Sequence, residues 1–114
     1  MAGEEKREFV RYSLELLVRV RWTDSSGDEK EETGTTKSIS SAGALMICPS
    51  KITTGSAVDL EIELPINLGG RLAKSCVAAS GRVVRNVPLT EPVRGYGHAV
   101  TFDRCRFLRP QQRV

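Results

Sequence analysis

The chain has 114 residues, enough for one domain and too few for two of ordinary size. Hydrophobic residues make up 39% and charged residues 27%, which supports one modest core and argues against a wholly disordered chain. Its 17 Lys and Arg exceed its 14 Asp and Glu by an amount too small to indicate nucleic-acid binding by itself.

The positive charge is concentrated in the second half of the sequence. Residues 1–57 carry eight basic and nine acidic side chains, whereas residues 58–114 carry nine and five. Twelve of the cations are arginines, whose planar guanidinium suits bidentate contacts with phosphates and guanine edges. The charged N-terminus lacks the apolar stretch of a signal peptide, and no apolar run approaches the roughly 20 residues of a membrane helix. We therefore expect no membrane insertion.

Alternation of apolar and polar residues predicts the first strand. Leu14, Leu16, Val18, Val20 and Trp22 share one face, and charged side chains occupy the other. A period of two is typical of a half-buried strand.

Five further strands are predicted along the chain. The polar segment 24–32 indicates a hairpin loop before the second strand. Pro49 and Pro65 are expected to end two strands, and Gly81 indicates a bulge or a close backbone contact within another. The five strands are predicted at 33–38, 43–48, 58–64, 76–87 and 95–102.

Six short strands separated by turn signals, with no interior helix, predict an all-β fold closed into a small barrel. Closure removes the edges that an open sheet of this size would expose. We interpret 1–114 as a single domain with an arm at 1–13, a barrel at about 14–103 and a short basic tail at 104–114. The segment 103–109 is compatible with one or two helical turns before Pro110.

Two short segments are candidates for ligand binding. Arg7 and Arg11, four residues apart ahead of the first strand, can converge on one ligand from a mobile arm. Between the second and third strands, Ser38, Ser40 and Gly43 combine hydroxyl groups with a glycine that lets a flat ligand approach the backbone. Either segment alone is better explained as a solvated arm or as an ordinary turn.

Taken together and in this order, the two segments resemble the PilZ domain family. The family pattern is RxxxR in an N-terminal arm, followed by [D/N]xSxxG on the barrel surface. The first motif is complete as Arg7 and Arg11, and the second has Ser40 and Gly43 with Ser38 where the family has Asp or Asn. Further matching segments are 43–46, 55–58, 60–65, 81–85 and 95–102, so that the resemblance spans about 6–103.

The resemblance implies a six-stranded antiparallel barrel that binds cyclic di-GMP, a bacterial second messenger. Arg7 and Arg11 would then grip phosphates and guanines, while Ser38, Ser40 and the Gly43 backbone would meet a guanine. Ordering of the arm would be the output, transmitted to an unidentified protein partner. Since Ser38 has a shorter reach than Asp or Asn, we expect binding weakened by about 5- to 150-fold.

Other functions have less support from the sequence. His98 on a predicted strand, the outward-facing Glu61 and Glu63, and Cys48 form no catalytic constellation, so we predict no enzyme, cofactor or metal site. Nucleic-acid binding is disfavoured, because few aromatic side chains remain for stacking once those on apolar strand faces, such as Tyr96, are set aside.

The alternative kept open is a PilZ-like adaptor that binds no nucleotide and acts only by docking to a protein. Arg104, Arg106, Arg109 and Arg113 are available for such docking. Three cysteines without zinc spacing favour reduced thiols and a cytoplasmic location in a bacterium.

Overall fold

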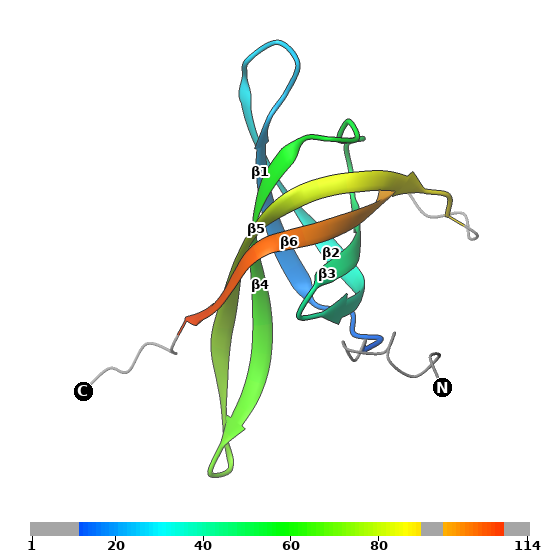
Figure 1. Cartoon of the computed structure of the whole chain (residues 1–114). Helices are drawn as coiled ribbons and strands as arrows, with labels where there is room; N and C mark the ends of the chain where they lie inside the picture. The colour runs from blue at the N-terminus through cyan, green and yellow to red at the C-terminus, as the bar shows by residue number, and fades with distance from the viewer. Residues whose placement is uncertain (1–11, 90–94, 109–114) are drawn as a thin grey trace, which may run out of the picture.

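The computed structural model describes residues 12–89 and 95–108 of the chain (Figure 1). Six strands, all antiparallel to their neighbours, form a closed barrel in the order β1-β2-β3-β6-β5-β4. The predicted all-β six-stranded barrel is therefore confirmed. Within the described ranges, no helix has the length and apolar character needed to cross a membrane. The strands are β1 (Leu17–Thr23), β2 (Glu29–Ser40), β3 (Gly43–Cys48), β4 (Ala57–Leu68), β5 (Arg71–Val87) and β6 (Tyr96–Leu108).

One face of each strand supplies the core, as the alternation predicted. Along β1 the burial pattern alternates strictly, although the strand begins at Leu17 rather than at residue 14. Trp22 is buried as predicted, whereas Tyr96, which the sequence assigned to an apolar face, is 47% exposed. The buried cluster comprises Val18, Val20, Trp22, Met46, Cys48, Ile52, Val58, Leu60, Ile62, Val77, Ala79, Val83 and Val100.

The loop between β1 and β2 is shorter than predicted. It occupies only the residues between Thr23 and Glu29, because Asp24 closes it tightly. The Asp24 carboxylate accepts hydrogen bonds from the backbone N–H groups of Ser26 and Asp28, both at 2.9 Å. The bond from Asp28 is the largest cause that holds the pKa of Asp24 below its usual value. The four charged residues that follow, 29–32, belong to β2 and pair with residues 20–23 of β1.

The β4–β5 hairpin is longer than predicted and projects beyond the rest of the barrel (Figure 1). Pro65 does not end β4, because that strand is paired there with β5 alone and its free edge needs no N–H group. The hairpin closes through Gly69 and Gly70, whose φ angles are +60° and +87°. Two positive φ angles match the right-handed twist of a tight hairpin, and glycine adopts them without strain.

The C-terminal strand also runs further than predicted. β6 continues to Leu108, and residues 103–108 therefore do not form the helical turns that the sequence allowed. Pairing with β5 explains the extension, because Ser80 faces Arg104 and Cys76 faces Leu108 across the ladder. A register shift at Gly81 confirms the predicted irregularity in β5. Residues 109–114 of the expected tail lie outside the described residues.

A buried histidine attaches the loop between β3 and β4 to the barrel. His98 on β6 is fully buried, and its Nε2 accepts a hydrogen bond of 2.9 Å from the backbone N–H of Ile52. Asn86 donates to the carbonyl of Ile52 at 3.2 Å, which holds the same point of the loop from β5. Because Nε2 accepts, the neutral ring carries its proton on Nδ1, 3.8 Å from Cys48 Sγ.

Burial keeps the side chains of His98 and Cys48 neutral. Desolvation lowers the pKa of His98, although the nearby charge of Glu32 opposes the shift. Burial also raises the pKa of Cys48 to about 12, and the charge of Glu32 adds to that shift. Glu32 itself accepts hydrogen bonds from the backbone N–H and the hydroxyl of Ser50. His98 is therefore a structural group of the core.

Lowering the pH from about 7 to about 5 is expected to destabilise the barrel. Since the folded pKa of His98 lies below the ordinary value of 6.5, the unfolded state binds the proton first. The contribution of His98 to the free energy of unfolding is therefore fully present above about pH 6.5. Below that pH, the free energy of unfolding falls by up to about 1.4 kcal/mol per pH unit. Urea unfolding at a series of pH values measures this slope. In His98→Gln, lower stability at pH 7 should accompany a flat profile down to about pH 5.5, and an equally flat wild-type profile would contradict the assignment.

Candidate functional site

The second candidate segment lies at the hairpin between β2 and β3. Ser38 and Ser40 belong to the end of β2, and Gly43 begins β3. In the ladder Ser38 faces Leu45 and Ser40 faces Gly43. Ile39 packs against the core, and alternation along the strand therefore directs Ser38 and Ser40 to its other face. Arg7 and Arg11 of the first segment lie outside the described residues.

The serine hydroxyl nearest the turn stabilises the hairpin. Ser40 Oγ accepts a hydrogen bond of 3.1 Å from the backbone N–H of Ala42, and the residue is 8% exposed. The carbonyl of Ala42 accepts a bond of 2.9 Å from the backbone N–H of Phe102 on β6. The turn is thus fixed both internally and against β6. The Ser40 hydroxyl proton is not used in the bond from Ala42 and can be donated elsewhere.

Gly43 is required by the backbone of β6. A Cβ atom at this position would overlap the carbonyl oxygen of Val100. β3 and β6 can therefore pair here only if the residue has no side chain. The fold therefore requires glycine at position 43, where the sequence predicted that glycine admits a ligand.

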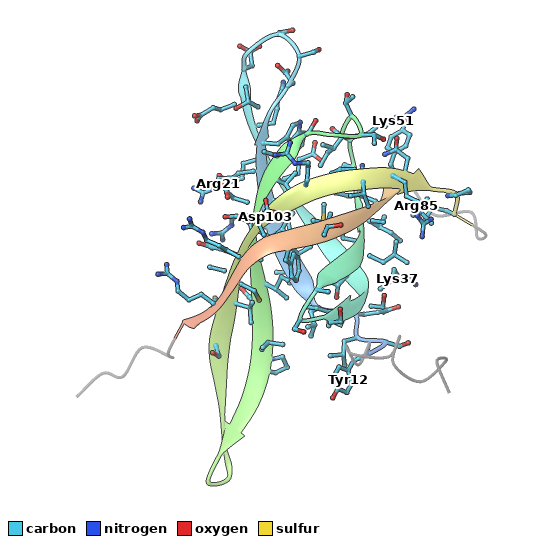
Figure 2. All side chains as sticks on the ribbon, in the orientation of Figure 1. Tyr12, Arg21, Lys37, Lys51, Arg85 and Asp103 are labelled. Carbon is cyan, nitrogen blue, oxygen red and sulfur yellow. The ribbon has the colours of Figure 1, made fainter. Side chains whose placement is uncertain are left out.

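The chain that leads into β1 is attached to the same hairpin. The backbone N–H of Tyr12 donates to the carbonyl of Ile39 at 2.8 Å, and the N–H of Ile39 donates back at 2.9 Å. Ile39 lies between the two serines of the candidate segment. Figure 2 shows Tyr12 and Lys37 on the same side of the molecule, away from Arg21. The root of the arm therefore lies alongside the serine segment.

A buried threonine fixes this root. Thr36 is fully buried on β2, and its Oγ1 donates to the carbonyl of Leu14 at 2.5 Å while accepting from the N–H of Leu16 at 2.9 Å. The N–H of Thr36 donates to the carbonyl of Leu16 at 2.9 Å. The ladder shifts register immediately after Thr36, leaving Lys37 unpaired with β3. Nothing in the sequence distinguished this threonine from others in polar strand positions.

The side chains considered for catalysis are engaged elsewhere. His98 and Cys48 are buried in the core, and Glu61 forms an exposed ion pair of 3.2 Å with Arg19. Within the described part of the chain, no group of three or more His, Cys, Asp or Glu side chains is arranged to hold a metal ion.

Comparison with known proteins gives two findings. The chain matches the PilZ domain family over residues 5–113. Its fold is similar to the solved structure of the Bacillus subtilis inhibitor of motility (MotI/DgrA), with a TM-score of 0.63 and 16% sequence identity. The similarity covers 87% of this chain and 43% of that one, so this chain corresponds to less than half of that protein. No curated protein sequence gives a significant match.

Thr36→Val is expected to loosen the root of the arm. Valine retains the shape of threonine but leaves the carbonyl of Leu14 and the N–H of Leu16 without their partner, which costs about 1–3 kcal/mol. Urea unfolding measures the loss, and amide hydrogen exchange at Leu16 measures the local opening. Thr36→Ser keeps the hydroxyl and is the matched control. Unchanged exchange at Leu16 in the valine variant would show that the hydroxyl does not hold the segment.

Proposed function

We propose, from the premise that this chain belongs to the PilZ domain family, that it is a receptor for cyclic di-GMP. PilZ domains are non-catalytic receptor domains. The proposal includes the transmission of the signal to a partner protein through ordering of the N-terminal arm. The observation that carries it is the pair of hydrogen bonds between Tyr12 and Ile39, which joins the end of the arm to the serine segment.

The covalent geometry of the arm supports a shared site. Arg11 is one peptide bond from Tyr12, and Tyr12 is hydrogen-bonded between the positions of Ser38 and Ser40. Consecutive Cα atoms are about 3.8 Å apart, so the Cα of Arg11 is within about 4 Å of the Cα of Tyr12, the residue that is hydrogen-bonded to this hairpin. Arg7 precedes it by four residues, a spacing that allows both guanidinium groups to approach one ligand.

The residue types suit the chemistry of the ligand. Cyclic di-GMP offers phosphate oxygens and the O6 and N7 acceptors of guanine, which guanidinium groups bind with two parallel hydrogen bonds. The guanine N–H groups need acceptors, and the Ser38 and Ser40 hydroxyls can provide them. In this proposal Arg7 and Arg11 hold the anionic part of the ligand, while the serines and the Gly43 backbone meet one base.

The arm is the element through which binding would be transmitted. Thr36 and Ile39 hold its root on β2, so an ordering event that begins at Arg7 and Arg11 is attached directly to the barrel. Ordering each residue of an arm costs about 1–2 kcal/mol of conformational entropy, and ligand contacts must offset this cost. A partner that recognises the ordered arm would then bind only the loaded receptor.

Calorimetric titration with cyclic di-GMP at physiological salt tests the proposal. Wild-type protein is expected to bind with a micromolar dissociation constant, and the Arg7→Ala, Arg11→Ala double variant is expected to bind at least about 100-fold more weakly because four charge-assisted hydrogen bonds are lost. An Arg21→Ala variant, which removes an exposed arginine of β1 on the side of the molecule away from Tyr12 (Figure 2), is the control. Equal binding by the double variant would show that the arginines do not form the site.

Ser38→Asn is expected to tighten binding by about fivefold or more. Asparagine has one more atom of reach and offers both a donor and an acceptor to the guanine edge. Ser41→Asn, at an exposed position of the same turn, should leave affinity unchanged. If the wild type and the Ser38→Asn and Ser38→Asp variants all fail to bind at about 100 µM ligand, the receptor proposal is wrong. The alternative, an adaptor that binds no nucleotide, then replaces it.

A further inference from the structure

A shallow groove follows β5 on the outer face of the barrel. Two adjoining hollows share Arg21, Asp59 and Ser80 and together form this groove. Its floor is made of small side chains, among them Ala78 and Ser80 on β5. Strands β1 and β4 provide one wall, and β6 provides the other.

Three of the carboxylates beside this groove already have partners. Asp59 accepts a hydrogen bond of 2.8 Å from the hydroxyl of Ser80. Glu31 and Glu61 both pair with Arg19, at 3.3 and 3.2 Å. Glu31 and Asp59 also face Arg21 across the ladder and offset its charge, whereas Arg104 and Arg106 face the neutral residues Ser80 and Ala78.

Three arginines of the groove have no such partner. Arg21, Arg104 and Arg106 are exposed, and none forms an ion pair with another residue in the part of the chain that the structure describes. Each guanidinium is permanently charged and has five N–H donors available for carboxylates. Because neutral residues face Arg104 and Arg106 across the ladder, these two arginines are the basic groups of the groove that remain open to an external anion.

We propose that this groove is the docking site for an extended, acidic segment of a partner protein. Arg104 and Arg106 are two residues apart on β6 and project from the same face about 7 Å apart. An extended peptide repeats its own side chains on one face at the same interval. Acidic residues at alternate positions of such a peptide therefore match the two arginines one to one.

The width of the groove favours a peptide over a small anion. Arg21 on β1 is separated from Arg104 on β6 by β4 and β5, a distance of about 14 Å between the strands. A single phosphate engages all three arginines only if their side chains converge from both walls, whereas a peptide lying over Ala78 and Ser80 can contact both walls.

The charge distribution also favours protein over nucleic acid. Glu29, Glu31 and Asp103 line the other end of the same groove. They would repel a polyphosphate backbone that continued along it. A peptide can place neutral or basic residues at that end and acidic residues at Arg104 and Arg106.

The groove is separate from the serine segment. In the closed order of strands, β4 and β5 lie opposite β2 and β3. Figure 2 shows Arg21 and Asp103 on the side of the molecule away from Tyr12 and Lys37. A partner in the groove therefore leaves Ser38 and Gly43 uncovered, and this inference stands whether or not the chain binds a nucleotide.

Titration of the ¹⁵N-labelled full chain with a synthetic peptide, followed by amide chemical shifts, tests the proposal. The probe is the capped peptide Gly-Glu-Ser-Glu-Ser-Glu-Gly, and the matched control peptide Gly-Glu-Glu-Ser-Ser-Glu-Gly has the same composition but no two glutamates two residues apart. We expect saturable shifts at Ala78, Ser80, Arg104 and Arg106, and at least about fivefold weaker binding of the control peptide because it presents fewer carboxylates on one face.

Variants distinguish a specific groove from general attraction to a basic protein. The Arg104→Gln, Arg106→Gln double variant should bind the probe at least about tenfold more weakly, whereas Arg85→Gln on the other side of the molecule should bind normally. Retained thermal unfolding confirms that each variant is folded. The proposal is overturned if the two peptides bind equally, if shifts fail to saturate at millimolar probe, or if an oligothymidylate of equal charge binds the groove as tightly.

Discussion

Closure of the barrel depends on how closely β6 approaches both of its neighbours. It pairs with β3 along one edge and with β5 along the other, so that every strand is part of one continuous sheet. Gly43 and Gly81 admit the same stretch of β6 from opposite sides, since a Cβ at either would overlap the carbonyl of Val100 or Thr101. Two hydrogen atoms in place of side chains thus allow the sheet to close around a small core.

This closure places the serine segment and the groove on two separate faces of the outer surface. On one, β2 and β3 present the serine segment, and Thr36 and Ile39 hold the chain that leads to the arm. On the other, β4 and β5 form the floor of the groove between arginines of β1 and β6. The faces are separated by a packed core, whose side chains have little freedom to rearrange. A ligand on one face and a partner on the other therefore do not compete for the same residues.

The sequence predicted those parts of the fold in which side-chain alternation was unbroken. β1, β3 and the first half of β4 read correctly, because their buried residues recur at every second position. The prediction from the sequence failed where hydrogen-bonded pairing with a neighbouring strand overrides the preferences of the local residues. Pro65 is tolerated on a free edge, and the Gly69–Gly70 turn joins two strands that were predicted too short. Residues 103–108 are extended because β5 offers a partner, which no local pattern in that segment reveals.

The candidate site was predicted only as far as its motif residues, and the structure separates their physical roles. Gly43 satisfies the approach of β6, and Ser40 caps the turn, so both would serve the fold of a chain that bound no nucleotide. Their presence is evidence for the barrel more than for a ligand.

Arg7, Arg11 and Ser38 are the motif positions that bear on ligand binding, and the two arginines remain predictions from the sequence. Thr36 lies outside the motif. It nevertheless attaches the root of the arm to β2, because its hydroxyl is hydrogen-bonded to the backbone of Leu14 and Leu16. The geometry of the site thus depends on a buried hydroxyl that no short surface motif contains.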